Sequence, residues 1–192
     1  MPKQNDIFHS ILIVSASPQF DQVVKKSLSG FSVIDQRKSA AMARRCILER
    51  YYDIIVVNSP LPDETGEGFA LDITQKCNAS VLLVTPQDSF ENARERVTEH
   101  GILTLPKPLP RQRFDRALKF LIAARNRIHE LEKKNRQLEE KMEEMRLVTK
   151  AKFFLIENES MTEDDAHRMI GKMAMDNGIS RGAAARRILD DA

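Results

Sequence analysis

Short apolar segments alternate with segments of helical spacing between residues 10 and 110. Runs such as Ile11–Val14 and Ile54–Val57 are wholly apolar, which is typical of strands buried in a parallel sheet. Between such runs, apolar residues recur every three or four positions, as in amphipathic helices. Strands are predicted at Ile11–Val14, Phe31–Ile34, Ile54–Val57, Val81–Val84 and Ile102–Leu105, and helices at Gln19–Leu28, Ala40–Arg50, Glu67–Cys77 and Phe90–Glu99.

This order predicts an α/β fold with a doubly wound, five-stranded parallel sheet of the flavodoxin-like type. The working site of such a sheet lies at the carboxyl ends of its strands. Ser15, Asn58, Thr85 and Lys107 each come just after a predicted strand. We therefore expect these four side chains to lie together at one edge of the sheet.

A long helix is predicted from Arg111 to about Glu157, because helical spacing continues there without proline or glycine. Written as heptads, the segment has one register with a mostly apolar seam. Its a positions are Phe114, Leu121, Ile128, Asn135, Met142 and Thr149, and its d positions are Ala117, Ala124, Leu131, Leu138, Met145 and Lys152.

This register favours a parallel homodimer. A buried asparagine at an a position, here Asn135, pairs best with its own copy. Arg127 would face Glu132 of a second chain, while Lys141 would face Arg146 as a mismatch. A single amphipathic helix packed on its own domain is the alternative. The predicted dimerisation residues are Leu121, Ile128, Leu131, Asn135, Leu138, Met142 and Met145.

The last segment predicts an all-α three-helix bundle that includes the end of the long helix. A capping box at Thr162–Asp165 opens a helix that stops at Asn177-Gly178, and Ser180 precedes a last helix at Arg181–Leu189. The predicted core consists of Phe154, Leu155, Ala166, Met169, Met173, Ile179, Ala184 and Ile188.

Composition and charge divide the chain into three predicted domains, at 1–110, 111–147 and 148–192. The net charge of +2 conceals a positive middle segment: residues 109–147 hold 11 basic and 7 acidic side chains. Cys46 and Cys77 form no C-x-x-C motif, which predicts neither a disulfide framework nor a zinc site. No apolar run is long enough for a membrane span, and the first residues do not resemble a signal peptide. We expect a cytoplasmic protein with no membrane partner, no metal and no cofactor.

Residues 10–120 resemble a response-regulator receiver domain. Val14-Ser-Ala-Ser-Pro18 stands where that family has valine, two acids, any residue and proline. Asn58, followed by Pro62 and Gly66, stands at the phospho-accepting aspartate. Thr85 matches the family's threonine or serine, and Lys107-Pro108 matches its lysine-proline pair.

The departures from the family concern its chemistry. The resemblance implies magnesium held by the acid pair and a carboxylate that attacks phosphorus, but Ser15, Ala16 and Asn58 carry no carboxylate. Thr104 stands at the usual aromatic switch position. Thr85 and Lys107 could bind a phosphoryl group, but neither could transfer one to the protein. Alternatively, Lys107 forms a hydrogen bond with Asn58 or with the backbone. The sequence predicts a degenerate, unphosphorylated domain, which serves either as an inert support or as a surface for a sensor protein or ligand.

The last segment resembles an ANTAR domain. The resemblance rests on Lys150–Ile156, on Glu163–Ala166, on Ala174 and on Ala184–Leu189. ANTAR domains are three-helix modules that bind RNA, usually in transcription antitermination. They recognise paired hairpin loops, and each domain of a dimer binds one loop. Phe153 departs from the family's usual glycine.

Basic residues of this segment are grouped, although its net charge is −1, from 7 basic and 8 acidic side chains. Its two aromatic rings, Phe153 and Phe154, can both lie in the core, and in that case arginine or His167 would have to stack on bases. Arg187 also lies on the last helix. The predicted RNA-binding residues are Lys150, Lys152, Arg168, Lys172, Arg181 and Arg186.

These patterns predict a dimeric, non-enzymatic regulator of transcription antitermination in a two-component signalling system, with hairpin-loop RNA as its partner. A DNA-binding regulator, with a helix-turn-helix around Ile179–Ala183, is one alternative. A protein-interaction adaptor that uses the same coiled coil and tail is another. An enzyme has no nucleophile, base or metal cluster to support it.

Overall fold

The computed structural model describes residues 9–190 and divides into two compact units that meet after Ile128. We call residues up to Ile128 unit 1 and residues from His129 unit 2, and each is described by itself. The predicted domains at 1–110 and 148–192 include residues 1–8 and 191–192, which lie outside the described residues. Most of the segment used to judge a signal peptide lies outside them as well.

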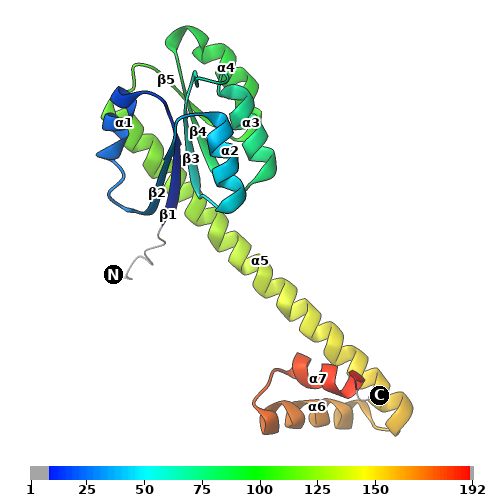
Figure 1. Ribbon diagram of the computed structural model, residues 1–192. Helices are drawn as coiled ribbons and strands as arrows, with labels where there is room; N and C mark the ends of the chain where they lie inside the picture. The colour runs from blue at the N-terminus through cyan, green and yellow to red at the C-terminus, as the bar shows by residue number, and fades with distance from the viewer. Residues whose placement is uncertain (1–8, 191–192) are drawn as a thin grey trace. The chain divides into compact units, whose positions relative to one another are not determined.

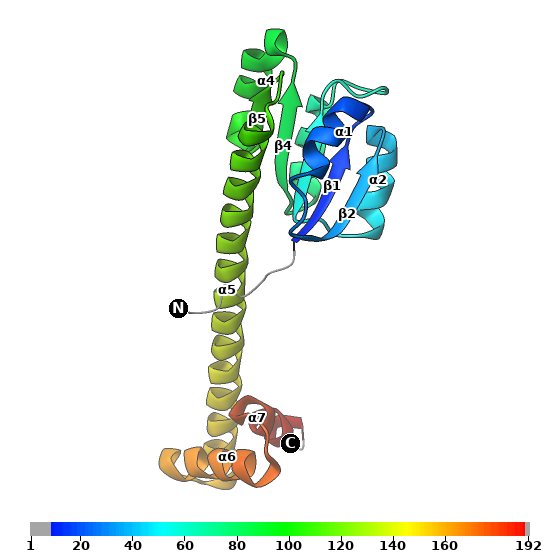
Figure 2. The ribbon, with the colours of Figure 1, turned by 90° about the vertical axis from the view of Figure 1, so that its left-hand side faces the viewer.

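Unit 1 is built on a five-stranded parallel sheet with the strand order β2-β1-β3-β4-β5 (Figure 1; Figure 2). The predicted doubly wound sheet is therefore confirmed. The strands are β1 His9–Val14, β2 Phe31–Arg37, β3 Ile54–Asn58, β4 Ser80–Thr85 and β5 Leu103–Pro106.

Helices cover both faces of this sheet (Figure 1). One face packs against α2, α3 and the end of α4, and the other packs against α1 and the beginning of α5. The helices are α1 Pro18–Lys25, α2 Ala40–Glu49, α3 Glu67–Lys76, α4 Phe90–Val97 and α5 Arg111–Glu159, and short 3-10 turns at Gln87–Ser89 and Thr98–His100 flank α4.

Local sequence signals explain where these helices begin. Ser17 and Ser39 are N-caps whose hydroxyls accept hydrogen bonds from the backbone N–H groups of Phe20 and Met42. Gly66 precedes α3 with a φ of 85°, and a Cβ there would lie 3.2 Å from Val57 Cγ1. Glycine at this position therefore lets the loop after β3 turn back tightly against the strand.

The first turns of α5 complete unit 1. Phe114, Ala117 and Leu121 lie in the core between α5 and the sheet, and Leu121 is only 4% exposed. Farther along, the guanidinium of Arg125 lies 3.5 Å from the carboxylate of Asp53. Among the predicted dimerisation residues, Leu121 is therefore wrong, and the heptad positions before it also belong to unit 1. Phe114, Ala117 and Leu121 are apolar because they cover their own sheet, so they are unavailable to a second chain.

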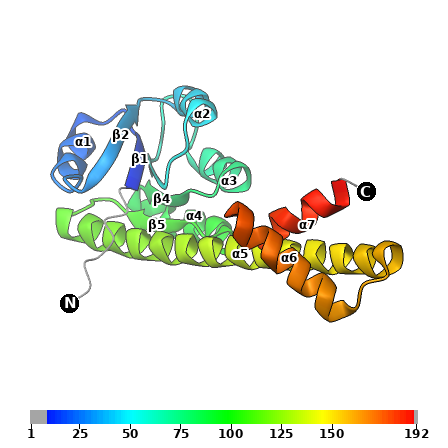
Figure 3. The same ribbon diagram turned by 90° about the horizontal axis from the view of Figure 1, so that it is seen from below.

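Unit 2 holds the remainder of α5 together with α6 Glu163–Asn177 and α7 Arg181–Asp190, and α6 crosses α5 obliquely (Figure 3). The hydroxyl of Thr162 accepts a hydrogen bond from Asp165 N at 3.2 Å, as the capping box predicts, and Gly178 ends α6 with a φ of 62°. The buried core is Ala151, Leu155, Ala166, Ile170, Ala174, Ala184, Ala185 and Ile188.

The predicted core of unit 2 is wrong at one position. Met169 is 38% exposed, and its neighbour Ile170 is 1% exposed. Ile170 follows Ala166 by four residues and precedes Ala174 by four, so these three side chains share the face that meets α5 and α7.

Candidate functional site

The edge at the carboxyl ends of β1 and β3 brings Ser15 and Asn58 into direct contact. Asn58 Nδ2 donates a hydrogen bond to Ser15 Oγ over 3.1 Å, and both residues are buried. Ser15 Oγ also accepts from the backbone N–H of Ser17 at 3.1 Å. Ala16, the other residue at the acid-pair position, is exposed. Ser15 and Asn58 therefore form a direct polar contact at this edge without any carboxylate.

Lys107 reaches the same edge from the end of β5. Its Nζ donates to the backbone oxygen of Ser59 at 2.5 Å. Burial lowers the pKa of Lys107, because desolvation disfavours the charged form. Its ammonium group is thus held by the loop that follows Asn58.

Buried oxygen atoms near this edge are neutral. Asn58 Oδ1, Thr85 Oγ1 and Thr104 Oγ1 are buried and have no hydrogen-bond partner among the described residues. Magnesium prefers anionic oxygen ligands, so the residues at 15, 16 and 58 do not fit the ion that receiver chemistry requires. Across residues 9–190, no three His, Cys, Asp or Glu side chains gather where they could hold a metal ion.

Acids in the loop after Asn58 turn away from this edge. The carboxylate of Asp63 accepts hydrogen bonds from the backbone N–H groups of Ala40 and Ala41, at 3.0 and 2.9 Å. The hydrogen bond from Ala41 is the main cause that lowers the pKa of Asp63. Glu64 forms an ion pair with Arg44 at 2.5 Å. Both acids therefore stabilise α2, a role that the sequence pattern did not reveal.

Predicted RNA-binding cations in unit 2 are partly engaged by acids at the start of α6. Lys152 Nζ lies 2.6 Å from Glu163 Oε1, and the pKa of Glu163 is lowered by this hydrogen bond. Arg168 lies 2.6 Å from Asp165, whose pKa is lowered by its hydrogen bonds with Thr162 and then Arg168. These cations are held in place while remaining at the surface.

Arg181 of α7 reaches α6 near Gly171. The guanidinium Nη2 of Arg181 is 4.0 Å from the place where a Cβ of Gly171 would stand. Lys172 is the next residue, and Arg168 lies one turn earlier on the same helix. The structure thus groups Arg168, Lys172 and Arg181 around Gly171, while Lys150 is exposed on α5.

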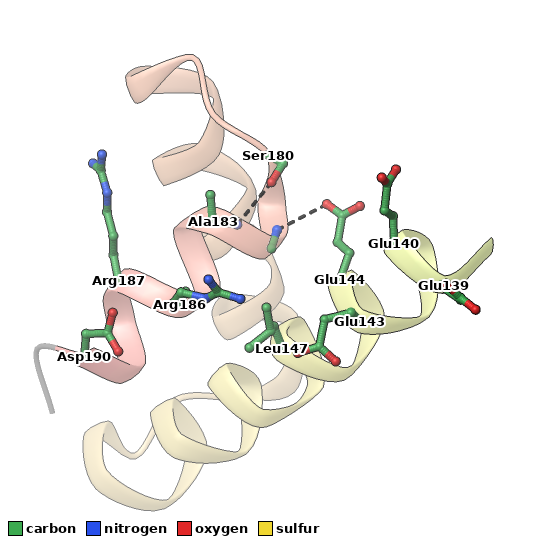
Figure 4. A pocket seen from close by; sticks show the side chains of 11 residues that line it. Glu139, Glu140, Glu143, Glu144, Leu147, Ser180, Ala183, Arg186, Arg187 and Asp190 are labelled. Carbon is green, nitrogen blue, oxygen red and sulfur yellow. Dashed lines mark hydrogen bonds between the residues drawn. The ribbon is translucent and has the colours of Figure 1, made fainter. Parts of the chain in front are cut away.

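Arg186 has a different setting, in a groove of about 700 Å³ between α5 and α7 (Figure 4). Its side chain extends toward α5, whereas Arg187 extends away from α5 (Figure 4). The backbone N–H of Gly182 donates to Glu144 Oε1 at 3.2 Å at the first turn of α7. Acidic side chains of this groove are Glu139, Glu140, Glu143, Glu144 and Asp190, and they disfavour an approaching RNA phosphate.

An apolar stripe follows the predicted seam along α5 from the last residue of unit 1, Ile128, to Met145. Asn135 is exposed within this stripe and donates to Glu139 Oε1 of its own helix at 3.3 Å. The other members and their exposed fractions are Ile128 41%, Leu131 51%, Leu138 58%, Met142 66% and Met145 62%. So many exposed apolar side chains in one row are typical of an interaction surface.

Phe153 is a surface residue, although the sequence also allowed it in the core beside the predicted core residue Phe154. It is 60% exposed, while Phe154 is half-buried against the core of unit 2. Because the two rings are adjacent on one helix, they point in directions about 100° apart. The pattern of neighbours at 151 and 155 could have indicated which ring faces outward.

Comparisons with known proteins agree with this architecture. Residues 136–189 match the ANTAR domain family, which is regulatory. Transcriptional regulatory protein PdtaR of Mycobacterium tuberculosis is 27% identical over 139 residues, which cover 72% of this chain and 67% of that protein. Residues 136–189 are thus an ANTAR domain, as the sequence resemblance predicted.

Solved structures share the fold of unit 1. A putative response regulator from Chloroflexus aurantiacus is 22% identical with a TM-score of 0.53, covering 60% of this chain and 98% of that chain. An adenylate cyclase structure from Rhodopirellula baltica is 20% identical with a TM-score of 0.61, covering 68% and 98%. Unit 1 has the receiver fold, and at these identities the likeness concerns the fold alone. In residues 9–190, no helix has the length and apolar character that crossing a membrane requires.

Proposed function

We propose that this response regulator, a receiver fold followed by an ANTAR domain, is a dimeric RNA-binding regulator of transcription antitermination. The observation that carries the proposal is the ANTAR domain at 136–189. Its core is apolar, and each of its helices contributes basic side chains to the surface. In this proposal each ANTAR domain binds one hairpin loop of a nascent mRNA in the cytoplasm. The protein acts by binding and is not an enzyme.

The proposed RNA face combines Lys150 and Lys152 of α5 with the cations around Gly171. Salt bridges to Glu163 and Asp165 orient Lys152 and Arg168, so less side-chain entropy is lost when RNA binds. Arg186 is left out of this face because it lies over the glutamates of the α5–α7 groove. The set that we propose is Lys150, Lys152, Arg168, Lys172 and Arg181.

The proposed dimer forms through the apolar stripe of α5 from Ile128 to Met145. Exposure of this stripe in the single chain supports a second copy as its cover. Joining two ANTAR domains in this way would raise the effective concentration of the second hairpin once the first is bound. We accordingly propose three domains: a receiver unit that extends into α5 to about Ile128, the coiled coil, and the ANTAR domain.

Unit 1 is proposed to be an unphosphorylated receiver. Ser15, Ala16 and Asn58 supply no carboxylate for a metal or for attack on phosphorus, and the Lys107 ammonium already donates to Ser59 O. A sensor protein or a ligand that binds this unit would then replace phosphorylation as the input.

A binding experiment tests the RNA proposal. The full chain would first select hairpins from a pool with a fixed stem and a randomised loop. A selected hairpin, the same hairpin with a changed loop, and duplex DNA would then be titrated over a range of salt concentrations. We expect tight binding to the selected hairpin alone. Lys152→Ala with Arg168→Ala should weaken it and lower the salt slope by about one per phosphate contact removed.

The matched control is Lys76→Ala with Arg94→Ala, which removes the same charges from exposed positions of unit 1. Equal binding to all three nucleic acids would indicate only nonspecific phosphate attraction, and preference for duplex DNA would favour the DNA-binding alternative. Failure to select any hairpin would contradict the proposal and favour a protein-interaction adaptor.

A further inference from the structure

A small hollow lies on the surface of unit 2 where α5 meets the beginning of α6. Its volume is about 140 Å³, and α5 supplies most of its lining. The lining residues are Thr149, Lys152, Phe153, Ile156 and Glu163. This volume resembles that of an engineered protein cavity of about 150 Å³ that binds benzene, so one ring-sized group fits it.

Phe153 gives the hollow an exposed aromatic wall. Unit 2 holds two phenylalanines and no tyrosine or tryptophan, and the other ring, Phe154, packs against the buried core. A phenylalanine that is 60% exposed leaves apolar area in water, which a stacking partner would cover. Aromatic side chains are the usual platforms on which proteins stack unpaired bases.

Polar groups of the hollow complement the edge of a base. Lys152 Nζ offers hydrogen-bond donors, and the Glu163 carboxylate 2.6 Å away offers acceptors. Lys150 lies three residues before Phe153 on the surface of α5, within reach of a flanking phosphate. The carboxylate repels a phosphate from the hollow itself, so the chemistry suits a neutral heterocycle there and phosphates beside it.

We infer that this hollow binds one unpaired RNA base, stacked on Phe153 and edged by the Lys152–Glu163 pair. The inference rests on the proposed function and adds a base-binding subsite to it.

A second copy of the chain fits the hollow less well. The seam positions next to it are Thr149 and Lys152, so the apolar row of α5 stops at Met145. Covering the hollow with a second helix would bury the Lys152–Glu163 pair and would place two Lys152 side chains opposite each other at a d position. Both arrangements are costly, whereas an RNA base leaves the pair partly hydrated.

The test uses the full chain and the hairpin selected as described above. Phe153→Ala and Phe153→Leu should weaken binding by about 5- to 150-fold, because base stacking on an aromatic ring is worth about 1–3 kcal/mol. Phe153→Tyr keeps the aromatic face and should bind like the wild type. Met175→Ala, which truncates an apolar side chain that is 82% exposed on α6, is the matched control and should change nothing.

An abasic scan of the loop then identifies the stacked base. At one loop position, removal of the base should weaken RNA binding by the wild-type protein. The same removal should have little further effect on RNA binding by the Phe153→Ala variant, which has already lost the stacking ring. Sedimentation velocity would follow the oligomeric state of each variant.

Three outcomes would overturn the inference. Unchanged affinity of Phe153→Ala and Phe153→Leu for a selected hairpin would overturn it while leaving the proposed function intact. Conversion of Phe153→Ala to monomers, with Phe153→Leu normal in both assays, would identify Phe153 as a dimer contact. Failure of the wild type to select any hairpin would remove the proposed function and this subsite together.

Discussion

Asn58 donates a hydrogen bond to Ser15 across the carboxyl ends of β3 and β1, with 3.1 Å between Nδ2 and Oγ. The two residues are 3% and 0% exposed, so neither partner can turn to water. In a receiver domain these positions carry acids that repel one another without a cation. Here the replacement by an amide and a hydroxyl turns a site of like charges into a neutral contact that stabilises the sheet edge.

Ser15→Ala should therefore destabilise unit 1. The change leaves the amide of Asn58 and the backbone N–H of Ser17 without their acceptor, and an unsatisfied buried donor costs about 1–3 kcal/mol. Tyr51 and Tyr52 are the only tyrosines and both lie in unit 1, so tyrosine fluorescence during urea unfolding reports this unit. Ser32→Ala is the control, because Ser32 is exposed. If Ser15→Ala lowered the free energy of unfolding as little as Ser32→Ala does, the structural role of Ser15 would be contradicted.

Asn58→Asp alone should not create a phosphorylated receiver. The new carboxylate would supply a nucleophile, but Ser15 and Ala16 would still offer magnesium no anionic ligand. Incubation with acetyl phosphate and magnesium, followed by intact mass measurement, should show no covalent phosphate on the wild type or on Asn58→Asp. Addition of Ser15→Asp and Ala16→Asp to the variant is the positive arm. Incorporation by the single variant would contradict the importance that we assign to the two missing acids.

Lys107 should make the stability of unit 1 depend on pH. Because burial lowers its pKa, the folded state releases the proton at a lower pH than the unfolded state does. Below that lowered pKa both states are charged and the folded state bears the desolvation cost. This cost disappears as pH rises toward the ordinary lysine pKa of about 10.4, so stability gains with pH.

Urea unfolding at a series of pH values between neutral and moderately alkaline would measure this gain. Lys107→Met should lose the rise in free energy of unfolding, whereas Lys38→Met, at an exposed position, should keep it. Parallel profiles for the wild type and Lys107→Met would show that Lys107 titrates alike in the folded and unfolded states.

The fold of unit 1 could be predicted from sequence because its strands are short apolar runs between helices, a pattern with few alternative topologies. The predicted meeting of Ser15 and Asn58 followed from that topology. The second strand was predicted too short, since Asp35, Gln36 and Arg37 are polar. β2 extends through them because, among the described strands, it lies at the edge of the sheet beside β1, and its outer side chains remain partly exposed.

The face of α5 could not be assigned in the same way. A heptad pattern records which side of a helix is apolar, but both a sheet and a second chain satisfy it. Leu121 therefore read as a seam residue although it packs on its own sheet. The choice of Met169 over Ile170 failed for a related reason. Adjacent apolar residues differ in direction by about 100°, and only the packed bundle decides which one is buried.

Gly66 should be more sensitive to substitution than Gly101, although both have positive φ values of 85° and 74°. A Cβ at Gly66 would lie 3.2 Å from Val57 Cγ1 and 3.3 Å from Ser59 Cβ, while nothing lies within 4 Å at Gly101. Gly101→Ala should cost about 1 kcal/mol for its backbone conformation alone. Gly66→Ala should cost about 1–3 kcal/mol more, because overpacking adds to that strain. Tyrosine-detected urea unfolding of both variants would compare them, and equal losses would mean that Val57 and Ser59 yield without cost.

Leu138→Lys should convert the proposed dimer to monomers without unfolding either unit. Leu138 is 58% exposed in the single chain, so a lysine there leaves the buried cores unchanged. In a parallel dimer, however, two ammonium groups would meet at one d position of the seam. Gln137→Lys adds the same charge at the neighbouring exposed residue, outside the stripe, and should remain dimeric. Sedimentation velocity would separate the two variants, with circular dichroism as the check on folding. A dimeric Leu138→Lys protein would exclude the α5 stripe as the dimer contact, and Asn135 would then have no role in setting register.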